Sequence, residues 1–255
     1  MPKNIWQDDE LIVALNLYWK IPYNKISGTS NKEIKEVAKQ IGRSSGGLAF
    51  KLMNYTSLDS ERQSKGNKGK DRGGSKEEII WEKYFNKWDE LAFESAKIIS
   101  NLTHKPIEDL IPIEEETFAL GKEKERTVRV RLNQSDFRQR ILASYNEKCC
   151  ITGIDIPKLL VASHIIPWSE NEIERLNPQN GLCLNSIHDK AFDKGLLTIT
   201  DDYKVKLSRD ILKKKNDEAI KHYFIKYENQ SIVLPDRYKP NLDFLAWHHT
   251  NRFEK

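Results

Sequence analysis

The sequence predicts an α+β protein with a helical N-terminal domain and a second domain that mixes short strands with helices. Apolar residues recur at helical spacing through much of residues 8–102. Residues 103–126 combine two prolines with an acidic run, which is typical of a linker between domains. Beyond them, short alternating segments bounded by turn residues indicate strands. We therefore expect domains at 1–102 and 127–255, joined by a linker at 103–126.

The composition indicates a globular protein with a very polar surface. Of the 255 residues, 38% are apolar and 31% are charged, and the mean hydropathy is −0.68. No apolar run approaches the roughly 18 residues of a membrane span, and the first residues lack the apolar segment of a signal peptide. We therefore expect a cytoplasmic protein with no membrane segment. The net charge of +4 is too small to demonstrate nucleic-acid binding by itself.

The three cysteines predict neither a disulfide framework nor a structural zinc site. Their number is odd, two of them are adjacent, and no C-x-x-C spacing occurs. We expect Cys149, Cys150 and Cys183 to be reduced thiols that pack as small apolar groups.

Two helices are predicted at the start of the chain. The first covers residues 8–20, with Asp8 as its N-cap. The second covers residues 30–41, where Ser30 and Glu33 have the spacing of a capping box.

A tight turn at 43–45 and a third helix through 47–53 complete a pattern that is typical of a helix-turn-helix. In that arrangement Arg43 and Lys51 would face phosphates or bases. The same spacing fits a three-helix bundle that makes no DNA contact, and the residues alone leave both interpretations open.

Residues 64–74 are rich in glycine, lysine and serine and contain no apolar side chain, so they cannot order themselves by burial. They form either a solvated loop or an arm that contacts phosphate. A long amphipathic helix is predicted after them, over 76–102, with an apolar face that packs on the first three helices.

The second domain is predicted to begin with a strand at 127–132, where apolar residues alternate with arginines. A helix over 134–145 follows, and its Arg138 and Arg140 are expected to face outward. They either follow a DNA backbone or form an ordinary solvated face. Alternation and turn residues predict a hairpin over 196–207.

The stretch 149–199 between these elements contains the candidate site. A short apolar strand presents His164, a polar loop with Arg175 follows, and Asn180 then opens a second apolar run. A short helix that bears His188 comes next. Two strands and a helix of this size would bring His164, Asn180 and His188 close together.

Phosphodiester hydrolysis is a reaction that such a set of residues can support. A histidine can activate water near neutral pH because its ordinary pKa is about 6.5, and a divalent ion can neutralise the developing charge. The residues alone also fit a structural histidine beside an Asn-Gly turn. They therefore leave a metal-assisted hydrolase and a purely structural cassette as alternatives.

The cassette resembles the HNH endonuclease family, whose fold is the ββα-metal finger. The resemblance rests on four segments, which read CITG, ASHIIPW, NPQNGLCL and HDKAFDKGL at 150–153, 162–168, 177–184 and 188–196. It implies that His164 is the general base, that His188 is a metal ligand, and that Asn180 braces the loop around the base. It also implies cleavage of DNA with Mg²⁺, Mn²⁺ or another divalent ion.

The sequence departs from the family beside the base. Many members have an acidic residue or a histidine there that binds the metal, whereas this chain has Ser163, and a hydroxyl is a poor ligand for a hard cation. We favour Asp193 as the second protein ligand. The alternatives are Asp189, or an ion that is held by His188, water and the phosphate.

The N-terminal part resembles the leader domain of bacterial restriction-type HNH proteins, on the segments 11–22, 41–44 and 52–59. Together the resemblances imply an endonuclease that cuts double-stranded DNA in restriction or phage defence. One site cuts one strand, so a homodimer is a reasonable expectation. The competing hypotheses are a DNA-binding regulator with a degenerate finger and a protein-interaction module.

Overall fold

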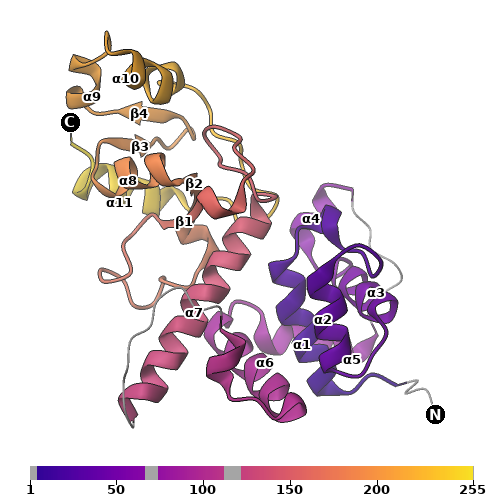
Figure 1. Cartoon of the computed structure of the whole chain (residues 1–255). Helices are drawn as coiled ribbons and strands as arrows, with labels where there is room; N and C mark the ends of the chain where they lie inside the picture. Colours follow the sequence, from indigo (N-terminus) through magenta and orange to yellow (C-terminus); the bar gives the residue numbers. More distant parts are fainter. Residues whose placement is uncertain (1–4, 67–73, 112–121, 255) are drawn as a thin grey trace. The chain divides into compact units, whose positions relative to one another are not determined.

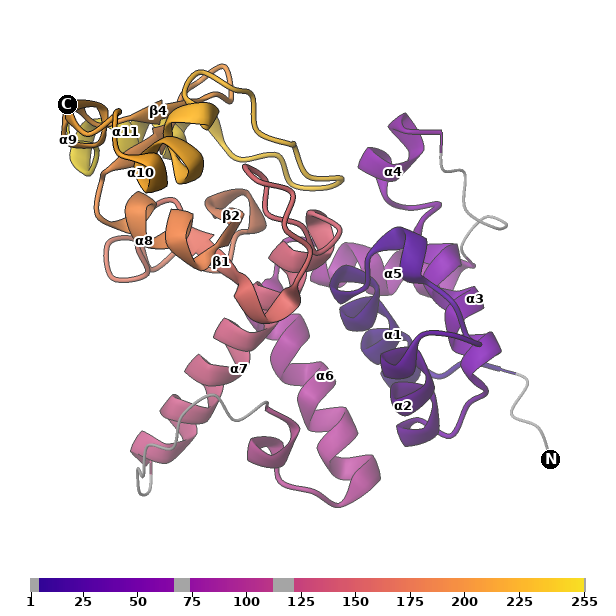
Figure 2. The same ribbon diagram turned by 45° about the horizontal axis from the view of Figure 1, so that its top comes forward.

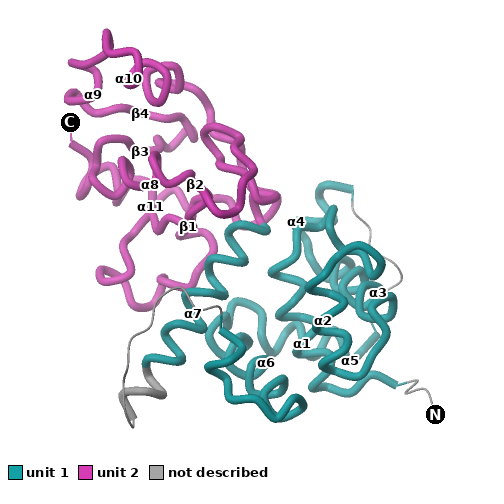
Figure 3. The backbone as a smooth tube through the Cα atoms, viewed as in Figure 1, with its two compact units in different colours: residues 1–143 teal, residues 144–255 magenta. Residues whose placement is uncertain are grey.

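The computed structural model describes residues 5–66, 74–111 and 122–254. The chain divides into two compact units, residues 1–143 and residues 144–255, which are coloured separately in Figure 3. Helices predominate, and the described residues also form two antiparallel two-stranded sheets, both in the second unit. The architecture is therefore α+β. No helix in the described part of the chain is long and apolar enough to cross a bilayer.

The first unit is helical and is built around one central helix (Figures 1 and 2). Helix α1 is buried almost continuously from Glu10 to Trp19, and it packs against α3, α5 and α6. The elements of this unit are α1 (Asp8–Lys20), η1 (Tyr23–Lys25), α2 (Lys32–Gln40), α3 (Ser45–Tyr55), α4 (Ser60–Ser64), α5 (Ser75–Tyr84), α6 (Trp88–Thr103), η2 (Ile107–Leu110) and nearly all of α7 (Lys122–Ser144).

The first helices occur where the sequence predicted them, but their caps differ. The N-cap of α1 is Gln7, one residue before the predicted Asp8, and the side chain of Glu10 completes a capping box with it. The N-cap of α2 is Asn31 rather than Ser30, because the Asn31 side chain accepts a hydrogen bond from the backbone of Ile34. Ser44 caps α3 in the same way.

The single helix predicted over 76–102 is two helices, α5 and α6. The chain turns at Phe85–Lys87, where Asn86 has a φ of +60°, a backbone conformation that asparagine tolerates better than most residues. Residues 67–73, most of the predicted Gly/Lys/Ser-rich loop, lie outside the described residues. So do residues 112–121 of the predicted linker.

The segment 127–132 is not a strand, as predicted, but the middle of the long helix α7. The alternation of valine and arginine over these six residues was too short to distinguish a strand from a helix. The next turns explain the outcome, because Leu132, Asp136 and Arg140 are buried at four-residue spacing and so lie on one face of a helix. Most of α7 belongs to the first compact unit, which ends at residue 143.

Arg140 faces inward, contrary to the prediction, and its side chain is 1% exposed. Its guanidinium forms an ion pair with Asp136 at 2.9 Å, donates to Asn16 Oδ1 at 3.2 Å and lies over the Trp88 ring. A charge buried in this way is compensated by these partners. Arg138, two residues earlier, is half-buried.

The side chains of Arg43 and Lys51 are also held within the first unit, although the prediction placed them against DNA. Arg43 is 8% exposed and pairs with Glu10 at 2.6 Å. Lys51 pairs with Glu77. Both cations lie near the Trp6 ring. They stabilise contacts between the chain start and the helices rather than present free charge to solvent.

The second unit contains the sheets and the shorter helices. Its elements are η3 (Pro157–Leu159), β1 (Leu160–His164), η4 (Pro178–Asn180), β2 (Gly181–Asn185), α8 (Ser186–Asp193), β3 (Leu197–Ile199), β4 (Val205–Leu207), α9 (Arg209–Lys213), α10 (Glu218–Tyr223), η5 (Ile225–Tyr227) and α11 (Leu242–Asn251). The predicted hairpin is confirmed as β3 and β4. The three cysteines are free and buried, as expected.

Candidate active site

The site is built on β1, β2 and α8. The strands pair antiparallel, with His164 opposite Gly181 and Ser163 opposite Leu182, and α8 packs against both strands. Asn185 ends β2 and caps α8, because its Oδ1 accepts hydrogen bonds from the backbone of Ile187 and His188. This cap fixes the direction in which α8 leaves the sheet.

Asn180 connects the two ends of the loop that follows β1. It is fully buried, and its Oδ1 accepts a hydrogen bond from the Ile166 backbone at 2.8 Å. Its Nδ2 donates to the carbonyls of Ile166 at 3.1 Å and Glu174 at 3.3 Å. These bonds match the bracing role that the family resemblance implied for Asn180.

His164 lies at the end of β1 with its ring held from two sides. Its Nε2 is 2.9 Å from the carbonyl oxygen of Arg175, and its ring contacts Trp168 edge to face. Burial lowers the pKa of His164 below its ordinary value. The hydrogen bond to Arg175 and the negative charge of Asp193 oppose that shift. The imidazole is therefore predominantly neutral at pH 7.

The carboxylates of Asp189 and Asp193 lie one turn apart on α8, on the side of the helix that faces the end of β1. Asp193 acts electrostatically on His164 and on Asp189. Burial raises the pKa of Asp189, and the nearby Asp193 raises it further, whereas the Ser163 hydroxyl lowers it. The Ser163 Oγ is buried without a hydrogen-bond partner of good geometry among the described residues. The hydroxyl is thus close enough to Asp189 to stabilise its carboxylate, without the geometry of a hydrogen bond.

His188 has a different environment. It is 2% exposed, with Nδ1 2.8 Å from Asn185 Nδ2 and Nε2 2.7 Å from the Tyr223 carbonyl oxygen. Its ring contacts Phe224 and Tyr227 edge to face. Both ring nitrogens are thus occupied by protein groups, so neither is open to a metal ion in this structure.

Arg175 lies beside the base. Its guanidinium is over the Trp168 ring, 5.0 Å from the centroid, and 3.3 Å from a carboxylate oxygen of Glu172. The sequence predicted that a positively charged side chain, Arg175, would lie in the loop that follows His164. It contained no signal that the Arg175 backbone would bind the His164 ring, because that contact depends on how the loop folds. The four-residue spacing of Asp189 and Asp193 does predict that both side chains lie on one face of a helix.

The described residues contain no group of three or more His, Cys, Asp or Glu side chains placed to hold a metal ion. The oxygen donors near the base are the two aspartates and the Ser163 hydroxyl. Two carboxylates suit Mg²⁺, which usually keeps several waters and binds through one or two carboxylates and substrate phosphate.

A comparison with protein families matches residues 149–200 to the family described as HNH endonuclease. The matched segment contains β1, β2, α8 and β3. A search of curated proteins finds no match to the chain.

Proposed function

We propose that this chain is a metal-dependent endonuclease with His164 as its general base. Residues 149–200 match the HNH endonuclease family, and a domain of this kind suggests nuclease activity on DNA. The observation that carries the proposal is the 2.9 Å contact between His164 Nε2 and the Arg175 carbonyl oxygen, on a ring that is also influenced by the negative charge of Asp193.

That contact supports Nδ1 as the nitrogen that acts as the base. A carbonyl oxygen only accepts hydrogen bonds, so Nε2 carries the ring proton and Nδ1 has the free electron pair. His164 Nδ1 takes a proton from a water molecule. The water oxygen forms a new bond to phosphorus as the bond from phosphorus to the 3′-oxygen breaks. The buried Asn180 keeps the loop, and hence the ring, in place.

Asp189 and Asp193 are the residues that would hold the metal ion, with water and a phosphate oxygen as further ligands. A bound Mg²⁺ or Mn²⁺ would supply positive charge against the negative charge that develops on the phosphate and the leaving oxygen. Burial, and to a smaller extent the negative charge of Asp193, raise the pKa of Asp189. This supports the assignment, because a cation between the two carboxylates would offset both effects. We propose that His188 has a structural role, in which its ring holds α8 to the Tyr223 backbone, and that it is not a metal ligand.

We propose double-stranded DNA as the substrate and restriction or phage defence as the setting, on the basis of the resemblance of both parts of the chain. Arg175 would contact a phosphate next to the one that is cut. The ion pair with the exposed Glu172 is too weak to keep the guanidinium from a phosphate.

The test is cleavage of supercoiled plasmid with Mg²⁺ or Mn²⁺ by the wild type, by His164→Ala and by a matched control, His222→Ala, whose side chain is exposed on α10. Loss of the base should slow cleavage by at least about 100-fold, whereas the control should cleave normally. Equal cleavage by wild type and His164→Ala would refute the role of His164. A wild type that binds DNA without cutting it would favour a DNA-binding regulator.

A further inference from the structure

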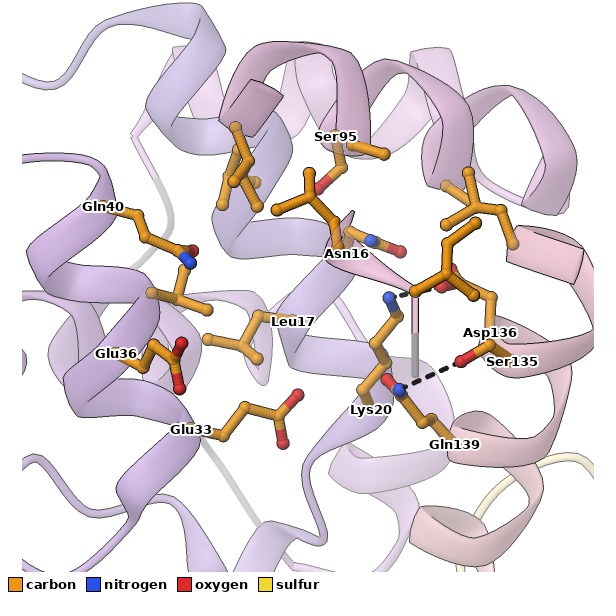
Figure 4. Close-up of a pocket in the computed structure, with 18 residues that line it drawn as sticks. Asn16, Leu17, Lys20, Glu33, Glu36, Gln40, Ser95, Ser135, Asp136 and Gln139 are labelled. Atoms are coloured by element: carbon orange, nitrogen blue, oxygen red, sulfur yellow. Dashed lines mark hydrogen bonds and ion pairs between the residues drawn. The ribbon is translucent and has the colours of Figure 1, made fainter. Parts of the chain in front are cut away.

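The helical unit contains a pocket that the nuclease chemistry does not use. Its volume is about 180 Å³, and all of its walls come from residues before 140, on α1, α2, α6, α7 and the segment that ends at Ile111 (Figure 4). A cavity of roughly 150 Å³ is enough to hold a benzene ring. The pocket is therefore large enough for one small ring system.

Two buried polar groups line this pocket and have unused hydrogen-bonding capacity. Asn16 is 6% exposed, and its Oδ1 is taken by Arg140 at 3.2 Å. Its Nδ2 donates to none of the described residues. Ser95 is 2% exposed, and its hydroxyl likewise has no partner in the described part of the chain. Buried polar groups are normally satisfied, so both favour a ligand that offers hydrogen-bond acceptors.

Carboxylates lie at the other side of the pocket. Figure 4 shows Glu33 and Glu36 on α2 pointing toward the space, opposite Asn16 and Ser95. Both glutamates are exposed, whereas the third carboxylate in the wall, Asp136, is buried and paired with Lys20 at 2.5 Å and Arg140 at 2.9 Å. The α2 side therefore favours hydrogen-bond donors and disfavours phosphate.

Aliphatic side chains form the remaining surface. Leu17, Val37 and Ile99 are among them, and Ala92 and Ala96 leave the space between the helices unfilled. A flat ring can lie against such walls while its edge meets the polar groups.

We propose that this pocket binds an amino-substituted nitrogen heterocycle of nucleobase size. The ring nitrogens accept hydrogen bonds from Asn16 Nδ2 and the Ser95 hydroxyl, and the amino group donates to Glu33 or Glu36. Two ligands have this chemistry: a free nucleobase, and a base of DNA that is turned out of the duplex. This site is independent of the nuclease site, so its test needs no divalent metal and no cleavage.

Adenine is the probe for a free base, and purine, which lacks the amino group, is its matched comparison. Binding to the full chain is measured by titration calorimetry and ligand-observed NMR without metal. We expect saturable binding of adenine and about tenfold weaker binding of purine, the effect of one lost hydrogen bond to a charged group. Adenosine monophosphate should bind more weakly than adenine, because its phosphate approaches the glutamates.

Variants test the location of the site. Ala96→Leu fills the pocket and should abolish binding, and Ser95→Ala should weaken it about fivefold. Glu36→Gln should weaken it as well, whereas Glu90→Gln, the same charge change at an exposed position of α6 outside the pocket, should not. Thermal melting confirms that each variant is folded. Binding that survives in a folded Ala96→Leu protein would overturn the proposal.

A second measurement distinguishes the source of the base. Duplex DNA that contains 2-aminopurine, an amino-substituted fluorescent base, brightens when that base leaves the stack. A rise on binding of the wild type that is absent with Ala96→Leu would identify a base from DNA as the occupant. Saturable adenine binding without that rise would identify a free base. If neither probe responds, the pocket has no such ligand and the proposal is wrong.

Discussion

Ser163 stands where a metal ligand was expected, and in the proposed site the two aspartates on α8 take that role. Asp189 is half-buried and electrostatically coupled to both Ser163 and Asp193. If these carboxylates hold the ion, removing one should weaken metal binding without loss of the fold.

We therefore predict that Asp193→Asn and Asp189→Asn each raise the Mg²⁺ concentration needed for half-maximal cleavage by about tenfold or more. Their melting temperatures without metal should stay close to that of the wild type. The measurement is plasmid cleavage over a Mg²⁺ titration, with Asp210→Asn on α9 as a control of equal charge. An unchanged Mg²⁺ requirement in both variants would exclude these carboxylates as ligands.

Substitution of His188 should lower stability and leave the Mg²⁺ requirement unchanged. It is buried with both ring nitrogens engaged, so His188→Ala leaves a cavity and unpaired polar groups. We expect a loss of about 3 kcal/mol in the free energy of unfolding, measured by urea denaturation. The Mg²⁺ requirement of the remaining folded enzyme should not change. A rise comparable to that of Asp193→Asn would restore His188 as a ligand.

The sequence predicted the position of His164 on β1 and of Asn180 before β2, because strand ends and an Asn-Gly pair have local signals. It did not predict which way His188 faces. That orientation depends on Tyr223, Phe224 and Tyr227, which are more than 30 residues away in the chain and contact the ring only in the folded unit. A motif specifies which residues are present, whereas packing specifies which face of the helix each one occupies.

The backbone just after α8 lies close to the backbone just after α11. Gly195 has a φ of +70°, and a Cβ at this position would overlap the carbonyl oxygen of Arg252, which follows α11. We predict that Gly195→Ala costs more than about 2 kcal/mol of stability, because the strained backbone conformation and the overlap add. Gly153→Ala is the matched control. Its φ is +75° and its surroundings are open, so it should cost only about 1 kcal/mol. Urea denaturation of both variants measures the difference.

Helix α11 is also held to α8 and β3 through His248. The His248 ring stacks on the Phe192 ring with 3.7 Å between the ring centroids. Its Nδ1 is 2.9 Å from Thr198 Oγ1, and its Nε2 is 3.1 Å from the Phe192 carbonyl oxygen. Burial lowers the pKa of His248 to about 4, and the positive charges of Arg252 and His249 act in the same direction.

This depressed pKa predicts an acid-sensitive fold. Between pH 6.5 and about 4 the unfolded chain binds the His248 proton and the folded chain does not, so stability is retained above pH 6.5 and falls as the pH decreases. The full effect is about 3 kcal/mol. His248→Gln should be less stable at pH 7 but should have a flatter stability profile between pH 7 and 4. An identical slope in both proteins would contradict the assignment.

Predictions of elements from sequence succeeded where the apolar pattern was long and failed where it was short or interrupted. Helix α1 and the hairpin of β3 and β4 follow their periodicity. Three alternating pairs at 127–132 resembled a strand, but the buried face of α7 extends well past them. The break between α5 and α6 at Asn86 has no proline or glycine to indicate it.

At the scale of the whole molecule, the proposed nuclease site of one chain would cut one strand at a time. We predict that nicked circles accumulate before linear plasmid at low enzyme concentration. The fraction of double-strand breaks should rise with protein concentration if two copies act together. Gel analysis over a concentration series measures this, with sedimentation velocity as an independent test of association. A constant ratio of linear to nicked product at all concentrations would exclude joint action of two copies.

The loop between β1 and β2 has a consequence for how this protein can vary. Two consecutive carbonyls in it, those of Glu174 and Arg175, bind Asn180 and His164 respectively. Inserting or deleting a residue before this pair changes the position of both carbonyls relative to β1. The loop length is therefore constrained although its surface is polar and partly exposed. Substitutions at its exposed positions should be tolerated, whereas changes in its length should leave an intact fold that turns over slowly.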